Sequence, residues 1–71
     1  MFTTIRYFYP NGIEGEAMDT TIKEHSSIDK AIKYCRRYAK GLRFAGIQVE
    51  DEEGNVIYEI TSDMEECDYR F

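Results

Sequence analysis

Ser26–Gly41 reads SSIDKAIKYCRRYAKG, and this stretch decides the fold because its apolar residues recur at helical spacing. Intervals of three or four residues place one apolar set along a single stripe: Ile28, Ala31, Ile32, Cys35, Tyr38, Ala39 and Leu42. Ser26 and Asp29 fit a capping box, in which the serine oxygen accepts from an unpaired backbone amide and the carboxylate reaches back. Gly41 suits the left-handed conformation that ends many helices. The stretch therefore predicts an amphipathic helix with one face for a core and one for water.

A first hairpin is expected before the helix. Phe2–Tyr9 (FTTIRYFY) is rich in aromatic and β-branched residues, which favour a strand. Pro10–Gly12 follows it, and an Asn-Gly pair after proline is typical of a tight reversal. The return strand is expected within Glu14–Ile22, where the alternation is only loose.

A second hairpin is expected after the helix. Arg43–Glu50 (RFAGIQVE) and Asn55–Thr61 (NVIYEIT) are two β-type runs around a turn at Asp51–Gly54. A register that pairs Glu50 with Asn55 best separates the apolar side chains from the polar ones. It places the apolar residues on one face: Ala45, Ile47, Val49, Val56, Tyr58 and Ile60.

The order strand, strand, helix, strand, strand predicts a two-layer α+β domain whose antiparallel sheet packs one face on the helix. The chain of 71 residues is long enough for one such domain, which we assign to residues 1–62. Residues 63–71 are expected to form an acidic tail without a regular element, which either frays or docks through Met64, Tyr69 and Phe71.

Neither the composition nor the motifs indicate a catalytic centre. His25 is the only histidine, the chain lacks a set of four zinc ligands, and no serine or cysteine comes with a base in a motif. Cys35 and Cys67 are expected to be free thiols. We therefore expect a protein that is not an enzyme and that uses no metal or cofactor. The chain lacks a run of roughly 20 apolar residues and a signal-peptide pattern, so a cytoplasmic location is expected.

Charge is segregated along the sequence. Residues 1–29 hold five acids and two bases, residues 30–43 hold six bases and no acid, and residues 44–71 hold nine acids and one base. The net charge is −5. Two surfaces of opposite sign are therefore candidates for binding a partner.

The acidic third is the first candidate, because a field of one sign attracts a basic protein groove. Duplex DNA carries one negative charge per roughly 1.7 Å of axis, so carboxylates on a rigid hairpin would imitate a phosphate track. Acidic residues with two aromatic anchors form the predicted partner-binding set: Glu50, Asp51, Glu52, Glu53, Asp63, Glu65, Glu66, Asp68, Tyr69 and Phe71. The alternative is that these charges only keep the protein soluble.

The basic helix face is the rival candidate, as a small module that binds nucleic acid or a phosphate ligand. Its predicted contacts are Lys33, Arg36, Arg37 and Lys40, with Lys30, Arg43 and Tyr34 beside them. The alternatives are a solvated face that complements the helix dipole and a homodimer in which an acidic hairpin docks on a partner's helix. The net negative charge disfavours direct binding of nucleic acid.

An acidic chain of this length, without catalytic residues and patterned as hairpin, helix, hairpin over residues 2–61, resembles several small anti-CRISPR proteins encoded by phages. The resemblance lies in layout alone and carries no residue role. It implies an inhibitor in the host cytoplasm that binds a nucleic-acid-handling effector, such as a Cas complex, stoichiometrically and often in the place of DNA.

Overall fold

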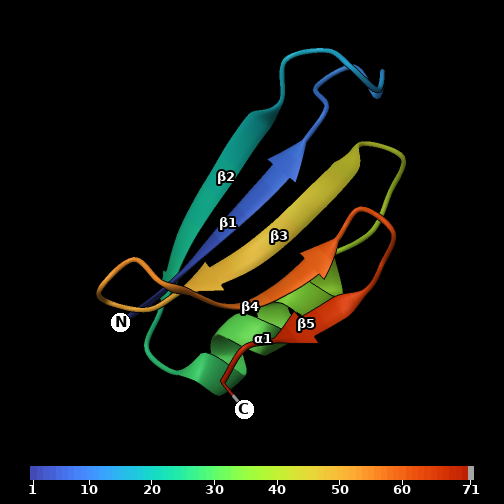
Figure 1. The fold of residues 1–71 in the computed structure, drawn as a ribbon. Coiled ribbons are helices and arrows are strands. Elements are labelled where there is room, and N and C mark those ends of the chain that lie inside the picture. Colours follow the sequence, from blue (N-terminus) through green and yellow to red (C-terminus); the bar gives the residue numbers. More distant parts are fainter. Residues whose placement is uncertain (71) are drawn as a thin grey trace.

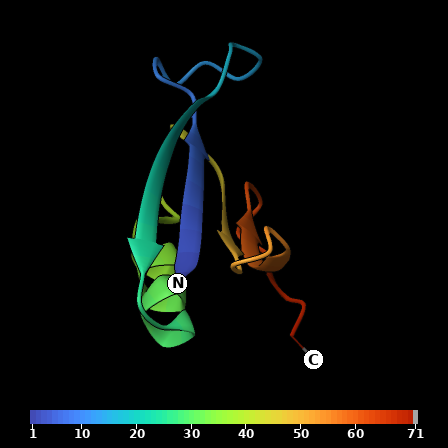
Figure 2. The ribbon, with the colours of Figure 1, turned by 90° about the vertical axis from the view of Figure 1, so that its left-hand side faces the viewer.

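The computed structural model describes residues 1–70 and has two layers (Figure 1). Along the chain the elements are β1 (Phe2–Phe8), β2 (Asp19–His25), α1 (Ile28–Tyr38), β3 (Phe44–Glu50), β4 (Val56–Thr61) and β5 (Glu66–Asp68). The strands form one sheet in the order β2-β1-β3-β4-β5, and every neighbouring pair is antiparallel. In Figure 2 the helix lies on one side of this sheet. The predicted α+β fold and its element order are confirmed, with a fifth strand added.

The first hairpin has a longer loop than the sequence indicated. The expected turn is present, because the Gly12 amide donates to the Tyr9 carbonyl at 2.9 Å. The Glu16 carboxylate then accepts from the Asn11 amide at 2.8 Å, which folds the following residues into a closed loop and lowers the pKa of Glu16. The chain therefore enters the sheet only at Asp19, and the predicted strand range of Glu14–Ile22 is wrong at both ends.

The helix begins one residue later than predicted. Ser27 is the N-cap, and its hydroxyl accepts from the Lys30 amide at 3.2 Å. A capping box needs an acceptor side chain three residues after the N-cap, and that residue is Lys30. The predicted Ser26–Asp29 box is therefore wrong. Asp29 still lies in the first turn, where a negative charge favours the helix dipole.

The helix also ends before its predicted last apolar residue. Ala39 is the C-cap, and its amide donates to the Cys35 carbonyl at 2.9 Å. Gly41 then has a φ of +97°, a conformation that a residue with a side chain adopts only with strain. The chain turns away here, so Leu42 is 98% exposed and does not belong to the core stripe as predicted.

The core lies between α1 and the middle of the sheet. Its buried residues come from α1, β3 and β4: Ala31, Ile32, Cys35, Ala39, Phe44, Ile47, Val49, Tyr58 and Ile60. The Cys35 thiol is fully buried, and this burial raises its pKa to about 12. It is therefore a protonated packing group at neutral pH, and both cysteines are free thiols.

The second hairpin has four of its residues on the predicted core face, but not the predicted register. Val49 pairs with Tyr58 and Ile47 pairs with Ile60, two residues away from the expected pairing. A shift of two leaves each side chain on its original face, because alternation has a period of two. The shift arises at the turn, where Glu50 pairs with Val56 across a bulge instead of with Asn55.

A second irregularity changes which residue of β3 reaches the core. The register between β1 and β3 shifts after Tyr7, and Gly46 has a φ of +148°. Phe44 is consequently buried, whereas Ala45, which was expected on the core face, is only half-buried. Val56 was also expected there and is exposed.

The strand β5 was not expected. Residues after Ser62 turn back through Met64, which has a φ of +66°, and Glu66–Asp68 then pairs with β4. Met64 itself is 55% exposed and does not dock as the sequence suggested. Phe71 lies outside the described residues.

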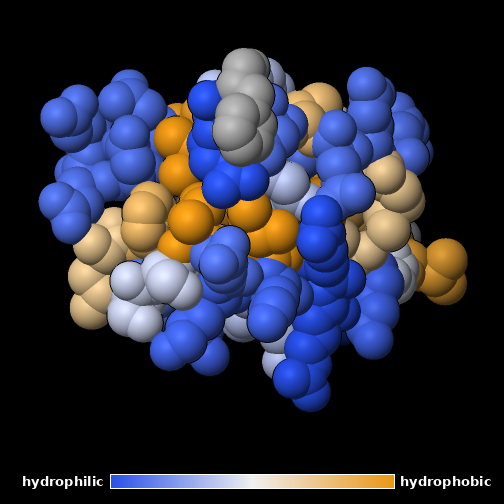
Figure 3. All heavy atoms as spheres, turned by 90° about the horizontal axis from the view of Figure 1, so that it is seen from below, coloured by the Kyte–Doolittle hydropathy of each residue, from blue (hydrophilic) through white to orange (hydrophobic). Residues whose placement is uncertain are grey.

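Both chain ends lie at the same end of the molecule (Figure 1). Seen from that end, hydrophilic side chains surround a small central group of hydrophobic ones (Figure 3). No helix in residues 1–70 is both long enough and apolar enough to cross a membrane.

Candidate functional site

The sheet face that points away from α1 is the first candidate surface, and we call it the open face. Side chains alternate along each strand, so the residues between the core-facing ones lie on it. Its larger side chains are Ile5, Tyr7, Ile22, Glu24, Gln48, Glu50, Ile57, Glu59 and Tyr69. Figure 2 shows no element of the described chain packed over this side.

Charge separates the open face from the helix side. The strands place Glu24, Glu50 and Glu59 on the open face, and no strand residue there is basic. The two basic residues of the strands point to the helix side instead. Arg6 donates through Nε to the Tyr38 carbonyl at 3.1 Å, and Lys23 Nζ lies 5.2 Å from the centre of the Tyr34 ring.

The predicted acidic set does not converge on one surface. Glu50 lies on the open face and accepts from Gln48 Nε2 at 2.9 Å. Residues 51–53 form the tip between β3 and β4, while Asp63 and Glu65 lie in the turn between β4 and β5. These two turns stand at opposite ends of β4, whose six residues span roughly 20 Å.

At the β3–β4 tip, two of the three acids have intramolecular partners. The Asp51 carboxylate accepts from the amides of Asn55 and Glu53, each at 2.9 Å, and these bonds lower its pKa. Glu52 forms an ion pair with the amino group of Met1 at 2.5 Å, which lowers the pKa of Glu52. Asp51 therefore shapes the turn, and Glu53 is the tip acid without such a contact in residues 1–70.

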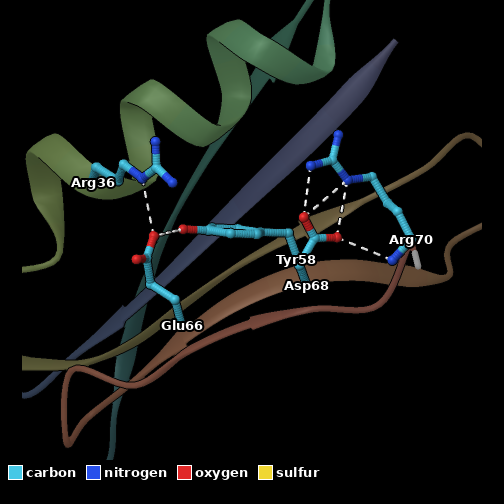
Figure 4. A network of polar contacts seen from close by, with 5 residues as sticks. All are labelled: Arg36, Tyr58, Glu66, Asp68 and Arg70. Atoms are coloured by element: carbon cyan, nitrogen blue, oxygen red, sulfur yellow. Dashed lines mark hydrogen bonds and ion pairs between the residues drawn. The ribbon is translucent and has the colours of Figure 1, made fainter.

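Glu66 points toward the helix (Figure 4). It accepts from Arg36 Nε at 2.9 Å and from the Tyr58 hydroxyl, and we call these three residues the β5 network. The bond from Tyr58 and then the one from Arg36 lower the pKa of Glu66. Burial, with the bond to Glu66, raises the pKa of Tyr58 to about 12.

Asp68 is likewise neutralised within the chain. Arg70 Nη2 donates to its carboxylate at 2.6 Å, and the bonds from Arg70 lower the pKa of Asp68 to about 2 (Figure 4). Glu66 and Asp68 therefore both have partners within the chain, and their predicted contact with a second protein stays a prediction.

Tyr69 is the predicted aromatic anchor that the structure places on the open face. Its amide donates to the Ile57 carbonyl at 3.0 Å, and its hydroxyl donates to the Glu59 carboxylate. The bond to Glu59 raises the pKa of Tyr69. The other predicted anchor, Phe71, lies outside the described residues.

Sequence reasoning missed Glu24 and Glu59 as surface acids of the same face. They are 35 positions apart, and only the strand order joins them. The signal that could have found them is their alternation with the core residues His25 and Tyr58.

A cleft between α1 and β2 is the second candidate surface, and we call it the basic cleft. It has a volume of about 250 Å³ and is lined by Lys23, His25, Lys30, Lys33, Tyr34, Arg37 and Tyr38. The predicted phosphate-binding residues Lys33 and Arg37 lie in it. Arg36 instead joins the β5 network, and Lys40 follows the end of the helix.

His25 has a packing role. It is 9% exposed, and its Nε2 lies 3.0 Å from the Thr4 hydroxyl. Burial, and then the charge of Lys23, lower the pKa of His25, so the ring is neutral at pH 7. Within residues 1–70, no three His, Cys, Asp or Glu side chains are grouped as a metal site would need.

Comparison with family models, with curated proteins and with solved structures found no match for the chain.

Proposed function

We propose that the protein is a non-enzymatic inhibitor that binds a nucleic-acid-handling effector, such as a Cas complex, through the open face. The observation that carries this proposal is the separation of charge between the two layers. The open face presents Glu24, Glu50 and Glu59, while the basic side chains of the strands and of the helix lie on the other side. Such a face suits a protein surface lined with lysine and arginine, which is the kind of surface that holds nucleic acid.

The acids lie near a pair of isoleucines on β1 and β2. The register aligns Ile22 with Ile5 and continues through Gln48 to Glu59, across four adjacent strands. Ile22 is 64% exposed, which is unusual for an isoleucine in a regular strand. A neighbouring row places Glu24 and Glu50 on either side of Thr3. The face therefore offers a pair of isoleucines with carboxylates near it.

The spacing of the carboxylates indicates how such a face would bind. Glu24 and Glu50 are two strand spacings apart, about 10 Å, whereas duplex DNA carries a charge per roughly 1.7 Å of its axis. The carboxylates are thus too sparse to replace a phosphate track by charge alone. Apolar and aromatic contacts from Ile5, Ile22 and Tyr69 would supply most of the affinity, and the acids would orient the encounter.

The test compares two triple variants with the same change in charge. The first is Glu24→Lys, Glu50→Lys and Glu59→Lys on the open face. The second, as the control, is Glu53→Lys, Asp63→Lys and Glu65→Lys in the two turns. Binding to purified Cas effector complexes and the inhibition of their DNA cleavage are measured for both.

We expect the open-face variant to lose binding and inhibition while the turn variant keeps both. Inhibition by the unmodified protein should reach completion at a fixed molar ratio, as stoichiometric binding requires. Equal inhibition by the open-face variant, or inhibition that continues at a small fraction of one equivalent, would contradict the proposal. Circular dichroism of each variant checks that the fold is retained.

A further inference from the structure

The basic cleft lies in the other layer of the molecule, and the proposed function does not use it. It is formed where α1 crosses the end of β2, so residues far apart in the sequence meet there. Lys23 comes from β2, whereas Lys30, Lys33 and Arg37 come from successive turns of α1. These four cations surround one hollow.

Within the described residues, none of these four cations forms an ion pair with an acid. The cleft lining contains no carboxylate, and the ion pairs within residues 1–70 involve the Met1 amino group, Arg36 and Arg70. Four positive charges around one concave site produce a positive potential that attracts an anion.

Two of the cations rest on aromatic rings. Lys23 Nζ lies 5.2 Å from the centre of the Tyr34 ring, and Arg37 Cζ lies 5.6 Å from the centre of the Tyr38 ring. Cation–π contacts at exposed sites are weak, at about 0.5–1 kcal/mol, so an arriving anion can draw these side chains toward itself. The cations are thereby held in place without being neutralised.

The aromatic side of the cleft is continuous. The ring centres of Tyr34 and Tyr38 are 4.5 Å apart, and His25 packs against Tyr34 at 4.9 Å. Tyr38 is 38% exposed, so part of its ring is accessible to a planar group from outside. Aromatic side chains beside a basic groove are the arrangement on which nucleic-acid bases stack.

The size of the cleft restricts the ligand. Its volume of about 250 Å³ lies below the roughly 300–1,000 Å³ of pockets that enclose a drug-sized molecule. A ligand that buries a phosphate among the cations and leaves one ring partly exposed on Tyr38 fits this restriction. A fully enclosed cofactor does not.

We propose that the basic cleft binds a phosphorylated nucleoside, with the phosphate held by Lys23, Lys33 and Arg37 and the base stacked on Tyr38. Both a free mononucleotide and the end of a single strand present this chemistry. The site lies on the helix side, so its occupation does not require the open face.

The first experiment titrates the intact ¹⁵N-labelled protein with three probes at low salt. Adenosine 5′-monophosphate carries both groups, ribose 5-phosphate carries only the phosphate, and adenosine carries only the base. We expect the monophosphate to bind about fivefold or more tightly than ribose 5-phosphate, because base stacking adds to the phosphate contacts. The shifted amides should lie in residues 23–38.

Matched variants separate the two parts of the site. Lys33→Glu should weaken binding of the monophosphate about tenfold or more, since it removes a charge-assisted bond and adds repulsion. Lys40→Glu makes the same change in charge outside the cleft and should leave the affinity within about twofold. Tyr38→Leu should reduce the affinity for the monophosphate to that for ribose 5-phosphate and leave the latter unchanged.

Equal binding of the monophosphate and ribose 5-phosphate, or equal losses for Lys33→Glu and Lys40→Glu, would overturn the proposal. A 5′-phosphorylated oligothymidylate distinguishes the two sources of the ligand. Binding more than tenfold tighter than the mononucleotide, with a steep salt dependence, supports a strand end. Similar affinity for the two supports a free nucleotide.

Discussion

The two flanks of α1 carry similar basic side chains, but these side chains have different partners. On the flank that faces β5, Arg36 donates to Glu66, which also accepts from the buried Tyr58. On the flank that faces β2, Lys33 and Arg37 line a cleft without a carboxylate. The difference indicates which charges the fold itself uses. Arg36 is part of how β5 is attached, whereas the charges of the cleft remain available to a ligand.

The largest expected difference between the flanks is in stability. Tyr58 is 2% exposed, so Tyr58→Ala creates a cavity in the core and should lower the free energy of unfolding by about 3 kcal/mol or more. Tyr38→Ala on the other flank removes a ring that is already 38% exposed, and it should cost about 1 kcal/mol or less. Urea denaturation followed by circular dichroism measures both. Similar losses for the two variants would mean that the flanks do not differ in this way.

The second prediction separates binding from stability with two reversals of charge on the same helix. Lys33→Glu should weaken binding of adenosine 5′-monophosphate about tenfold and leave Tm nearly unchanged. Arg36→Glu should do the opposite, because it places a negative charge against Glu66 and lowers Tm by a few degrees. Calorimetric titration and thermal unfolding of each variant provide the two readouts. Loss of nucleotide binding in Arg36→Glu would show that the two flanks act as one surface.

The faces of the elements could be predicted from the sequence because they depend on periodicity. The stripe of α1 and the alternation of Ile47 with Val49 and of Tyr58 with Ile60 are local properties, and most of these residues reach the core, although Tyr38 and Leu42 of the predicted stripe do not. The register could not be obtained in this way. A shift of two residues preserves every face. One residue of the shift comes from the turn, where Glu50 pairs with Val56, and the other from the bulge between Val49 and Glu50, and neither leaves a mark in the alternation.

The candidate sites were harder to predict than the fold, because their residues meet only through tertiary structure. Glu66 and Asp68 alternate with Cys67 and Tyr69, but the run is short and rich in acids, which are rare in strands. Arg36, the partner of Glu66, lies 30 positions earlier in the chain. Similarly, Lys23 joins the basic cleft only because β2 lies next to the start of α1. Composition located the charges of each sign along the chain, but it could not distinguish paired charges from unpaired ones.

The third prediction concerns pH, because the flanks contain groups that titrate in different ranges. The folded chain lowers the pKa of His25 below its ordinary value of 6.5, chiefly through burial. It also lowers the pKa of Glu66 below 4.5 and that of Asp68 from 3.8 to about 2. In each case the unfolded chain binds more protons than the folded chain as the pH falls. The contribution of each group to the free energy of unfolding is therefore present above its ordinary pKa and is lost below it.

We therefore expect Tm to fall in two steps on acidification, first below pH 6.5 and again below pH 4.5. Thermal unfolding between pH 7 and pH 2 measures this profile. His25→Gln should flatten the upper step alone, and Glu66→Gln should reduce the lower step alone. An upper step that persists in His25→Gln would assign it to another group.

The smallest expected effect is that of Glu66→Gln at neutral pH. The pair of Arg36 with Glu66 is 63% and 48% exposed, so water and salt screen most of its attraction. Glutamine keeps an oxygen that accepts from the Tyr58 hydroxyl and from Arg36, so Tm at low salt should change less than in Arg36→Glu. This difference should shrink further at 1 M salt, where charges are screened within about 3 Å.

Glu66→Ala is the matched control, because it removes the acceptor as well as the charge. The half-buried Tyr58 hydroxyl then loses its partner, so Glu66→Ala should destabilise the protein more than Glu66→Gln at every salt concentration. If the two variants were equal, the charge and not the hydrogen bond would hold β5. If glutamine is tolerated and alanine is not, the burial of Tyr58 and the hydrogen bond from its hydroxyl stabilise this flank, and the charge of Glu66 mainly neutralises Arg36. The positive field of α1 is then directed toward β2, where the cleft lies.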